Sequence, residues 1–399
     1  MLSYLTAGES HGDVIVSIIE GLPAGLAVDI NFINQELKLR QGGFGRGRRM
    51  KMEKDRVQIL TGLRRGKTIG SPVTLMIKNL VRNINQISPL TNVRPGHADL
   101  AGAMKLGLTD ARDVAERASA RETTGRVVAG ALAKILLHQF NIKIFGYVTQ
   151  IGGIDCCSVV IPETTGIYKS GFKKIDSAIE RIRNHSSFYS LTPGIEPLWA
   201  EKIKEAKNKG DTLGGVFEII AFNVPVGLGH YAQWHQRLDG RLAQALMAIP
   251  SVKGVESGLG FWSGKFFGSE VHDSVKFSKG CALMNAGGGF ARRTNKAGGL
   301  EGGMTNGENI VLRAAVKPIP TLQNPLPSIN LKTKRMALAG VERSDTCVVP
   351  AALVVGEAVV AFEIARSFLD KFGGDSMDEL DRNFTAYQRE LKEKYFKNL

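Results

Sequence analysis

Short apolar runs and longer stretches with helical spacing alternate irregularly along the chain. Runs rich in β-branched residues, bounded by turn residues, predict strands near residues 14–20, 73–78, 144–151, 216–224 and 310–315. Apolar positions repeated at helical spacing predict helices over 124–140, 237–249 and 350–372, the last of which ends at Gly373. This irregular order predicts an α+β fold, because a doubly wound sheet requires a regular βαβ cycle.

Three further stretches have the pattern of helices at the protein surface. The sequences FKKIDSAIERIRNH (172–185) and EPLWAEKIKEAKNKG (196–210) are amphipathic, and we expect them to be solvated and peripheral. Near the C-terminus, SMDE places Ser376 and Glu379 at the spacing of a capping box, which predicts the start of a last helix. We expect none of the three to take part in catalysis.

Composition adds a charge imbalance and narrows the class of protein. Hydrophobic residues make up 43% of the 399 residues, ample for a packed core, and the formal net charge of +14 predicts anionic partners.

The N-terminal residues lack a signal-peptide pattern. The apolar stretch 350–362 is too short to span a bilayer and contains Glu357, so we predict a cytoplasmic protein without membrane contact. The four cysteines show neither a disulfide framework nor metal-ligand spacing, so we predict no metal site.

Much of the positive charge lies in one glycine-rich segment, RQGGFGRGRRMKMEKDR, residues 40–56. An RNA-binding arm of this kind usually interleaves several aromatic residues that stack on bases, but the segment contains only Phe44. A solvated loop is the other interpretation. The nearby GLRRGKT has three residues between its glycines where a Walker A loop has four, and no G-x-G-x-x-G occurs. Walker and Rossmann phosphate sites therefore have no support.

A serine and a histidine stand side by side in GESHG, in a turn enclosed by two apolar runs. Ser10 and His11 lie between Gly8 and Gly12, which permit tight backbone turns. We expect them on a strand-to-strand connection, where side chains are well presented. The alternative is a turn in which the serine hydroxyl only bonds its own backbone. Partners elsewhere in the chain decide between the two.

Other motifs place charged residues on turns or at helix starts. RPGHAD contains Arg94, His97 and Asp99 on a Pro-Gly turn, and the alternative there is that Asp99 only caps the next helix. ERASARETTGR groups arginines and a serine at a helix entrance, where backbone amides and guanidinium groups can hold an anion. The motifs KPIPT and VERSDTC contribute Lys317, Thr321, Arg343 and Asp345.

Taken together and in this order, GESHG, RPGHAD, RxSARET, KPIPT and RSDTC closely resemble the chorismate synthase family, over about residues 3–372. The resemblance implies a β-α-β sandwich, in which helices are held between antiparallel sheets. It also implies a single domain over residues 1–399 with a peripheral C-terminal helix near 376–396, and assembly as a homotetramer.

The same resemblance implies an activity and a cofactor. Family members convert 5-enolpyruvylshikimate 3-phosphate to chorismate and phosphate by a 1,4-anti elimination, which requires reduced FMN although no net redox change occurs. NADPH would serve only indirectly, for flavin reduction, and we expect a separate flavin reductase because no nicotinamide motif stands out. Substrate and flavin are both anionic. This accounts for the arginines, because burying such charge without counter-ions costs many kcal/mol.

Matching motif by motif assigns binding residues to this chain. Substrate contacts, or NADPH contacts in some relatives, are expected at Arg40, Arg46, Arg49 and Arg121. Flavin contacts are expected from Arg117, Ala118, Ser119, Pro250, Ser251, Gly302, Lys317, Pro318, Ile319, Pro320, Thr321 and Arg343. Many relatives carry an amide residue followed by alanine at the positions of Pro250 and Ser251, so we expect backbone contacts there.

The resemblance implies catalytic roles as well. His11, positioned beside Ser10, would protonate the departing phosphate, and His97 would stabilise the reduced flavin at its N1/O2 edge. Asp345, with Ser119 nearby, would accept the proton from flavin N5. Two other classes stay open: a basic RNA-binding protein without enzymatic activity, and a different flavoprotein that oxidises its substrate.

Overall fold

Two antiparallel sheets contain most of the strands of the protein. The computed structural model describes residues 1–47, 54–156, 172–278, 289–342 and 345–396. The first sheet has the order β1-β2-β6-β3, with β1 (Ser3–Ala7), β2 (Val14–Glu20), β3 (Val57–Ile59) and β6 (Val73–Lys78). The second has the order β10-β15-β9-β7-β8, with β7 (Lys143–Ile151), β8 (Ile154–Asp155), β9 (Gly215–Phe222), β10 (Val252–Ser257) and β15 (Ile310–Val316). The five strands expected from the sequence are confirmed, with ends within two residues of the predicted ones.

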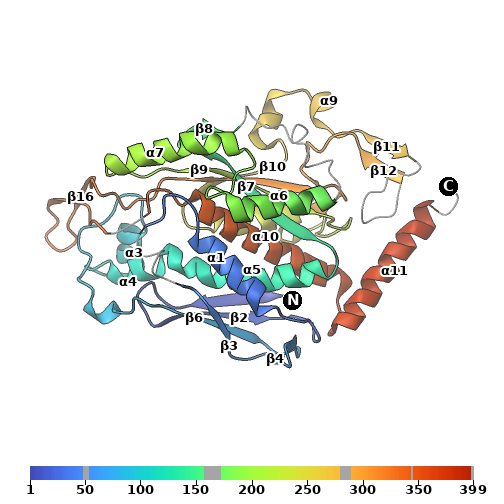
Figure 1. The fold of residues 1–399 in the computed structure, drawn as a ribbon, viewed down its shortest axis with the longest axis horizontal. Helices are drawn as coiled ribbons and strands as arrows, with labels where there is room; N and C mark the ends of the chain where they lie inside the picture. Colours follow the sequence, from blue (N-terminus) through green and yellow to red (C-terminus); the bar gives the residue numbers. More distant parts are fainter. Residues whose placement is uncertain (48–53, 157–171, 279–288, 343–344, 397–399) are drawn as a thin grey trace.

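Long apolar helices connect the two sheets. Helix α5 (Thr123–His138) packs on β1, β2 and β6, whereas α10 (Val349–Phe372) packs on β7 and β9. The two helices also pack against each other, with α1 (Ile30–Gln41) beside them (Figure 1), and α8 (Leu238–Met247) packs on α10. The predicted helices are confirmed to within two residues at each end, and the mixed fold with antiparallel sheets is confirmed with them.

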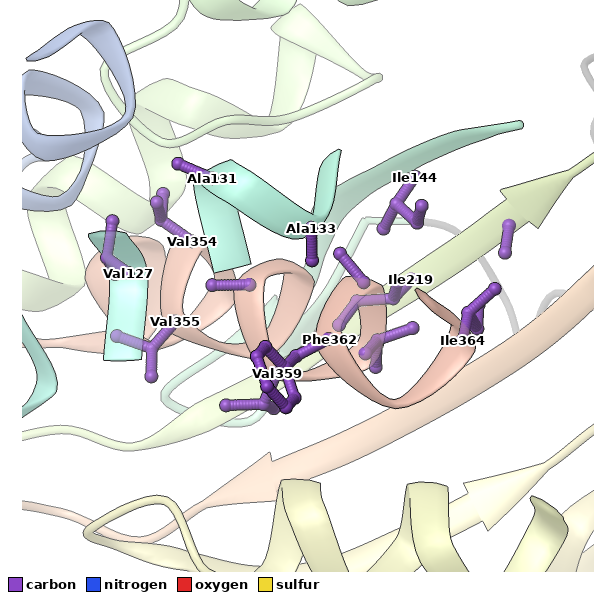
Figure 2. Close-up of a cluster of buried hydrophobic side chains, with 14 of the residues drawn as sticks. Val127, Ala131, Ala133, Ile144, Ile219, Val354, Val355, Val359, Phe362 and Ile364 are labelled. Atoms are coloured by element: carbon purple, nitrogen blue, oxygen red, sulfur yellow. The ribbon is translucent and has the colours of Figure 1, made fainter. Parts of the chain in front are cut away.

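The core lies where α5 and α10 meet the strands. Figure 2 shows valines of both helices and alanines of α5 beside isoleucines of β7 and β9, and these side chains are buried. The two helices approach so closely that a methyl group added at Gly130 would lie 2.4 Å from the Cα and Cβ atoms of Ala358. Because interiors are close-packed, a larger residue at position 130 can be accommodated only if the helices move apart.

A buried cluster of charges crosses this helical layer. Lys134 of α5 donates hydrogen bonds to Glu36 of α1 at 2.6 Å and to Glu357 of α10 at 2.9 Å. Glu357, which is fully buried, also accepts from Arg183 and from the backbone N–H of Gly146. Burial raises the pKa of Glu357, but the charges of Arg183 and Lys134 outweigh this and hold the pKa below its usual range. Two cations and two carboxylates thus compensate one another inside the protein.

The helices expected to be solvated are present, but they are not wholly at the surface. Helix α6 (Phe172–His185) buries Ile182 and Arg183, and α7 (Glu196–Asn208) buries Trp199 and Ile203. Burial of the apolar face is what an amphipathic pattern predicts, so only the largely buried position of Arg183 differs from the expectation of solvated helices. The physical reason is that Glu357 neutralises Arg183, so a residue that reads as polar surface can lie inside.

The last helix, α11 (Met377–Phe396), begins close to the predicted capping box. The N–H of Glu379 donates to Ser376 Oγ at 3.3 Å, while the Glu379 carboxylate accepts from the N–H of Asp375. Leu380 and Phe384 are buried against the end of α10, and Figure 1 shows the rest of α11 extending away from the sheets.

The remaining elements are short. They are β4 (Leu63–Arg64), β5 (Lys67–Thr68), η1 (Ile84–Gln86), α3 (Asp99–Leu106), α4 (Arg112–Arg117), η2 (Ala120–Glu122), η3 (Pro193–Ile195), η4 (Trp234–Gln236), η5 (Gly260–Lys265), α9 (Gly268–Val271), β11 (Val275–Ser278), β12 (Gly289–Arg292), β13 (Leu300–Glu301), β14 (Met304–Thr305), β16 (Pro327–Ile329) and β17 (Met336–Leu338). Within the described residues, no helix is long and apolar enough to cross a membrane.

Candidate active site

Ser10 and His11 lie on the connection between β1 and β2, as the sequence predicts. The turn needs glycine at Gly8, which has a φ of +108° and where a Cβ atom would lie 2.1 Å from a backbone oxygen. The backbone N–H of Ser10 donates to the carbonyl of Glu116 at 3.1 Å, and Ser119 Oγ donates to Ser10 Oγ at 3.2 Å. The hydroxyl of Ser10 therefore has a partner outside its own turn.

Glu116, at the end of α4, holds His11 in place. Its carboxylate accepts the backbone N–H of His11 at 2.9 Å, and both of its oxygens lie 3.0 Å from His11 Nδ1. Burial raises the pKa of Glu116, but the hydrogen bonds and charge of His11 and the charge of Arg112 outweigh it, so this pKa is lowered. Sequence reasoning missed Glu116, because a contact across 105 residues leaves no signal in local spacing.

Two of the expected substrate arginines, Arg40 and Arg121, are buried around one carboxylate, Asp55. Arg121 Nη1 lies 2.7 Å from Asp55 Oδ1, and Arg40 Nη1 lies 3.9 Å from Asp55 Oδ2. Burial lowers the pKa of Arg40 to about 9; Asp55 and Asp345 oppose this effect, while Arg121 and Arg46 add to it. With Arg46, three guanidinium groups thus face two carboxylates, Asp55 and Asp345, and this excess of positive charge favours an anion.

Asn79 joins this arginine cluster to the turn that carries His11. Its side-chain carbonyl accepts from Arg121 Nε at 2.8 Å, and its amide donates to the carbonyls of Glu9 and Gly12. The histidine turn and the arginines thus form one continuous, hydrogen-bonded site. Asn79 was not singled out by the sequence.

Asp345 lies beside Arg46, the third expected substrate arginine among the described residues. Arg46 Nη1 donates to Asp345 Oδ2 at 2.6 Å, and the N–H of Gly47 donates to Asp345 Oδ1 at 2.6 Å. The next residue, Thr346, donates its N–H to the carbonyl of Gly45 at 2.9 Å. The loop after α1 and the loop before α10 are thereby fastened together. The fourth expected arginine, Arg49, lies outside the described residues.

His97 lies on the turn before α3, paired with a second carboxylate. Its Nδ1 lies 2.5 Å from Asp99 Oδ1, and Asp99 also accepts from Arg94 Nε at 2.7 Å. Burial raises the pKa of Asp99, but the hydrogen bonds from His97 and Arg94 hold it well below its usual range. Asp99 therefore holds Arg94 and His97 in place through hydrogen bonds to both. The residue at the N-cap position of α3 is Ala98, which makes no side-chain cap.

The KPIPT segment meets this turn from the second sheet. Lys317 Nζ donates to the carbonyl of Gly96 at 2.5 Å, and Arg94 Nη1 donates to Thr321 Oγ1 at 3.2 Å. The N–H of Lys317 donates to the carbonyl of Ser251, whose φ of +71° is strained for a residue with a side chain. Pro250, Pro318, Ile319 and Pro320 continue the same two segments.

The other expected flavin residues are distributed more widely. Arg117 donates to the carbonyls of Thr6 and Gly8 at 2.8 Å, and the N–H of Ala118 closes the end of α4. Gly302 lies in the turn between β13 and β14, and within the described residues no hydrogen bond joins it to the other candidates. Arg343 lies outside those residues.

The carboxylates beside the histidines predict a specific acid dependence of stability. Because Glu116 and Asp99 have lowered pKa values in the folded protein, the unfolded chain binds more protons below their usual values of 4.5 and 3.8. Their stabilising effect is present above that range and is lost as pH falls. In thermal unfolding between about pH 5 and pH 3, we expect the melting temperature of Glu116→Gln to fall less steeply than that of the unsubstituted protein. Parallel curves would contradict this origin.

Comparison with known proteins gives a consistent result over nearly the whole chain. Residues 2–369 match the chorismate synthase family. The chorismate synthase of Geobacter metallireducens is 48% identical over 399 residues, covering 97% of this chain and 98% of that protein. That of Desulforudis audaxviator is 49% identical and covers 98% of both chains. One solved structure, a crystal structure of chorismate synthase, is 40% identical, covers 98% of both chains and has a TM-score of 0.78.

Proposed function

This chain belongs to the chorismate synthase family, and from that premise we propose that it eliminates phosphate from 5-enolpyruvylshikimate 3-phosphate by a 1,4-anti route that requires reduced FMN. As a family member it is a carbon–oxygen lyase that acts on a phosphate ester. The observation that carries the proposal is the continuity between His11 and the buried arginines through Asn79. A proton donor therefore adjoins a site for a multiply charged anion.

Two arginines support an anionic substrate, because each has a buried N–H donor without an acceptor in the described part of the chain. Arg40 Nη1 and Arg46 Nε are buried and have no hydrogen-bond partner among the described residues. A buried donor without an acceptor costs about 1–3 kcal/mol, more when it is charged. The carboxylates and phosphate of the substrate would supply these acceptors, and guanidinium groups bind such oxygens in pairs. We therefore propose substrate contacts at Arg40, Arg46, Arg49 and Arg121.

The residues around the turn of His97 support the proposal of a flavin cofactor. Lys317 and His97 adjoin Gly96 and offer a cation and an imidazole to an anionic reduced flavin. The chemistry that reduced FMN would supply when bound is transient electron donation for the loss of phosphate and an acceptor for the hydrogen that leaves C6 of the substrate. We propose that His97 stabilises the reduced form, and that the RxSARET and KPIPT segments bind the flavin, together with Pro250, Ser251, Gly302 and Arg343.

His11 is suited to the role of acid. Because Glu116 occupies Nδ1, the other nitrogen, Nε2, is the one that can deliver a proton to the departing phosphate. The His11 side chain is 23% exposed, so a ligand can reach it, whereas that of Glu116 is 3% exposed. We propose that Ser10 assists His11 in orienting the phosphate.

Asp345 is suited to accept a proton once its arginine is engaged elsewhere. Arg46 and the N–H of Gly47 each donate a hydrogen bond to one of its two oxygens. Binding of the substrate anion to Arg46 would weaken that pairing and leave the carboxylate available as a base. We propose this order of events, with the hydroxyl of Ser119 close to the proton path.

An anaerobic turnover experiment tests the function. Purified protein is mixed with photoreduced FMN and 5-enolpyruvylshikimate 3-phosphate, and phosphate, chorismate and flavin redox state are followed together. We expect equal amounts of phosphate and chorismate with the flavin still reduced. Oxidised flavin in proportion to product would favour a flavoprotein that oxidises its substrate, and salt-sensitive RNA binding without turnover would favour an RNA-binding protein.

Arg46→Ala is expected to weaken substrate binding by at least about tenfold, because it removes charged hydrogen bonds to the anion. The substrate affinity of Arg46→Lys should lie between those of Arg46→Ala and the unsubstituted protein, since lysine keeps the charge but not the paired donors. Isothermal titration with substrate measures the effect, and Arg64→Ala, an exposed arginine of β4, is the control. Unchanged affinity in Arg46→Ala would remove this residue from the substrate site.

We propose that the packing of α5 and α10 between the two sheets is the β-α-β sandwich of the family, in one domain over residues 1–399. One hydrophobic cluster shared by both sheets supports this. We also propose a homotetramer, because the first sheet exposes apolar side chains of β1 and β2, such as Leu5 and Ile18. NADPH would act only through a separate flavin reductase.

A further inference from the structure

A chain of alternating charges connects the two histidine turns. Arg112 Nη1 lies 3.7 Å from Glu116 Oε1 and donates to Glu342 Oε1 at 2.5 Å. The other oxygen of Glu342 lies 3.4 Å from Arg94 Nη1, and Arg94 donates to Asp99 through Nε and Nη2. We call these seven residues the ion-pair chain: His11, Glu116, Arg112, Glu342, Arg94, Asp99 and His97.

Glu342 is the centre of the ion-pair chain, since its two oxygens reach one arginine each. Three different parts of the sequence meet there: α4, the turn before α3, and the loop that leads to Asp345. The backbone of Glu342 is held by Gln323, whose Nε2 donates to its carbonyl at 2.9 Å, and its partner Arg112 is held by the carbonyl of Ser88, which accepts from Nε at 3.1 Å.

We propose that Glu342 is a positioning residue that couples His11 to His97, so that a change at one imidazole is transmitted to the other. The coupling itself follows from the contacts. Its consequence for turnover rests on the proposed function, in which His11 serves the departing phosphate and His97 serves the flavin.

The physical reason is competition for two carboxylates. Without the charge of Glu342, Arg112 would turn toward Glu116, from which it is separated by 3.7 Å, and would compete with His11 for the same oxygens. On the other side, Arg94 already lies 3.1 Å from His97 Nδ1 and shares Asp99 with it. Glu342 therefore keeps each arginine from displacing its histidine.

Glu342→Gln tests the proposal, because glutamine keeps the shape of the side chain and removes its charge. The protein is labelled with ¹³C-histidine, and the imidazole signals of His11 and His97 are assigned from His11→Asn and His97→Asn. We expect both signals to move in Glu342→Gln. The matched control is Glu363→Gln, whose carboxylate lies near two other arginines, Arg241 and Arg366, and should leave both signals in place.

Transmission is measured in the same spectra. We expect His97→Asn to move the His11 signal when Glu342 is present and to leave it unmoved in the Glu342→Gln background. Arg112→Gln is a second variant, which cuts the ion-pair chain on one side and should move the His11 signal more than the His97 signal. Movement of only one histidine signal in Glu342→Gln, or of neither, would overturn the coupling.

Turnover gives the functional readout. We expect Glu342→Gln to lower kcat about tenfold with a smaller change in KM, and its effect to be less than multiplicative with that of Glu116→Gln. A wild-type kcat in Glu342→Gln would contradict a positioning role in the reaction. The spectra need no substrate, so the absence of product with the unsubstituted protein would reject the proposed function and leave the test of coupling intact.

Discussion

Replacing His11 with asparagine is expected to slow chorismate formation roughly 1,000-fold while reduced FMN and substrate still bind. Asparagine can place its amide N–H where the imidazole Nδ1 lies, so the 3.0 Å contact with Glu116 can be kept. It cannot supply Nε2, the atom proposed to protonate the departing phosphate. The rate of phosphate release under anaerobic conditions measures the effect, and flavin and substrate affinities are titrated separately.

The control for this experiment is His235→Asn, an exposed histidine after β9, for which we expect normal turnover. His11→Ala removes the contact with Glu116 as well and should be no more active than His11→Asn. Turnover near that of the unsubstituted protein in His11→Asn would mean that another group is the acid. Parallel losses of binding and turnover would instead assign His11 a structural role in the turn.

The second large effect is expected at Asp345, where asparagine should lower turnover roughly 100-fold and leave flavin binding intact. Asparagine still offers one oxygen to the N–H of Gly47, which lies 2.6 Å from the carboxylate. It cannot accept a proton as a carboxylate does, and it no longer neutralises Arg46. The measurement is single-turnover product formation at saturating substrate.

A double substitution separates these two consequences. If Asp345 only restrains Arg46, the change will appear in substrate affinity, and Asp345→Asn will add little to Arg46→Ala. If Asp345 is a base, its effect will remain in turnover at saturating substrate, whichever residue occupies position 46. Tight substrate binding with normal turnover in Asp345→Asn would contradict the base assignment.

Much of the fold could be predicted, because each main strand is a short apolar, β-branched run bounded by turn residues. Residues 14–20 and 73–78 alternate between buried and less buried positions, as expected of strands with one face on a core. The depth of α6 could not be predicted in this way. Hydrophobic periodicity counts Arg183 as a surface residue, whereas Glu357, 174 positions away, compensates its charge in the core.

The site shows the same division between local and distant information. The turns of His11 and His97 could be predicted, because glycine and proline mark them in the sequence. Asp99 stands two residues from His97 and is visible with it. Glu116 and Asp55 gain their roles from contacts between distant segments, and no local pattern distinguishes them from solvated charges.

Gly130 allows α5 and α10 to pack closely, and this packing also affects the residues at the starts of the two helices. Helix α5 begins at Thr123, two residues after Arg121, and α10 begins at Val349, after the loop that carries Asp345. Position 130 lies about 10 Å along α5 from its first turn. A methyl group added there would push the two helices apart. The residues just before each helix, which include Arg121 and Asp345, would move with them. The close approach of Gly130 to Ala358 in the core therefore limits how far apart the starts of α5 and α10, next to Arg121 and Asp345, can lie.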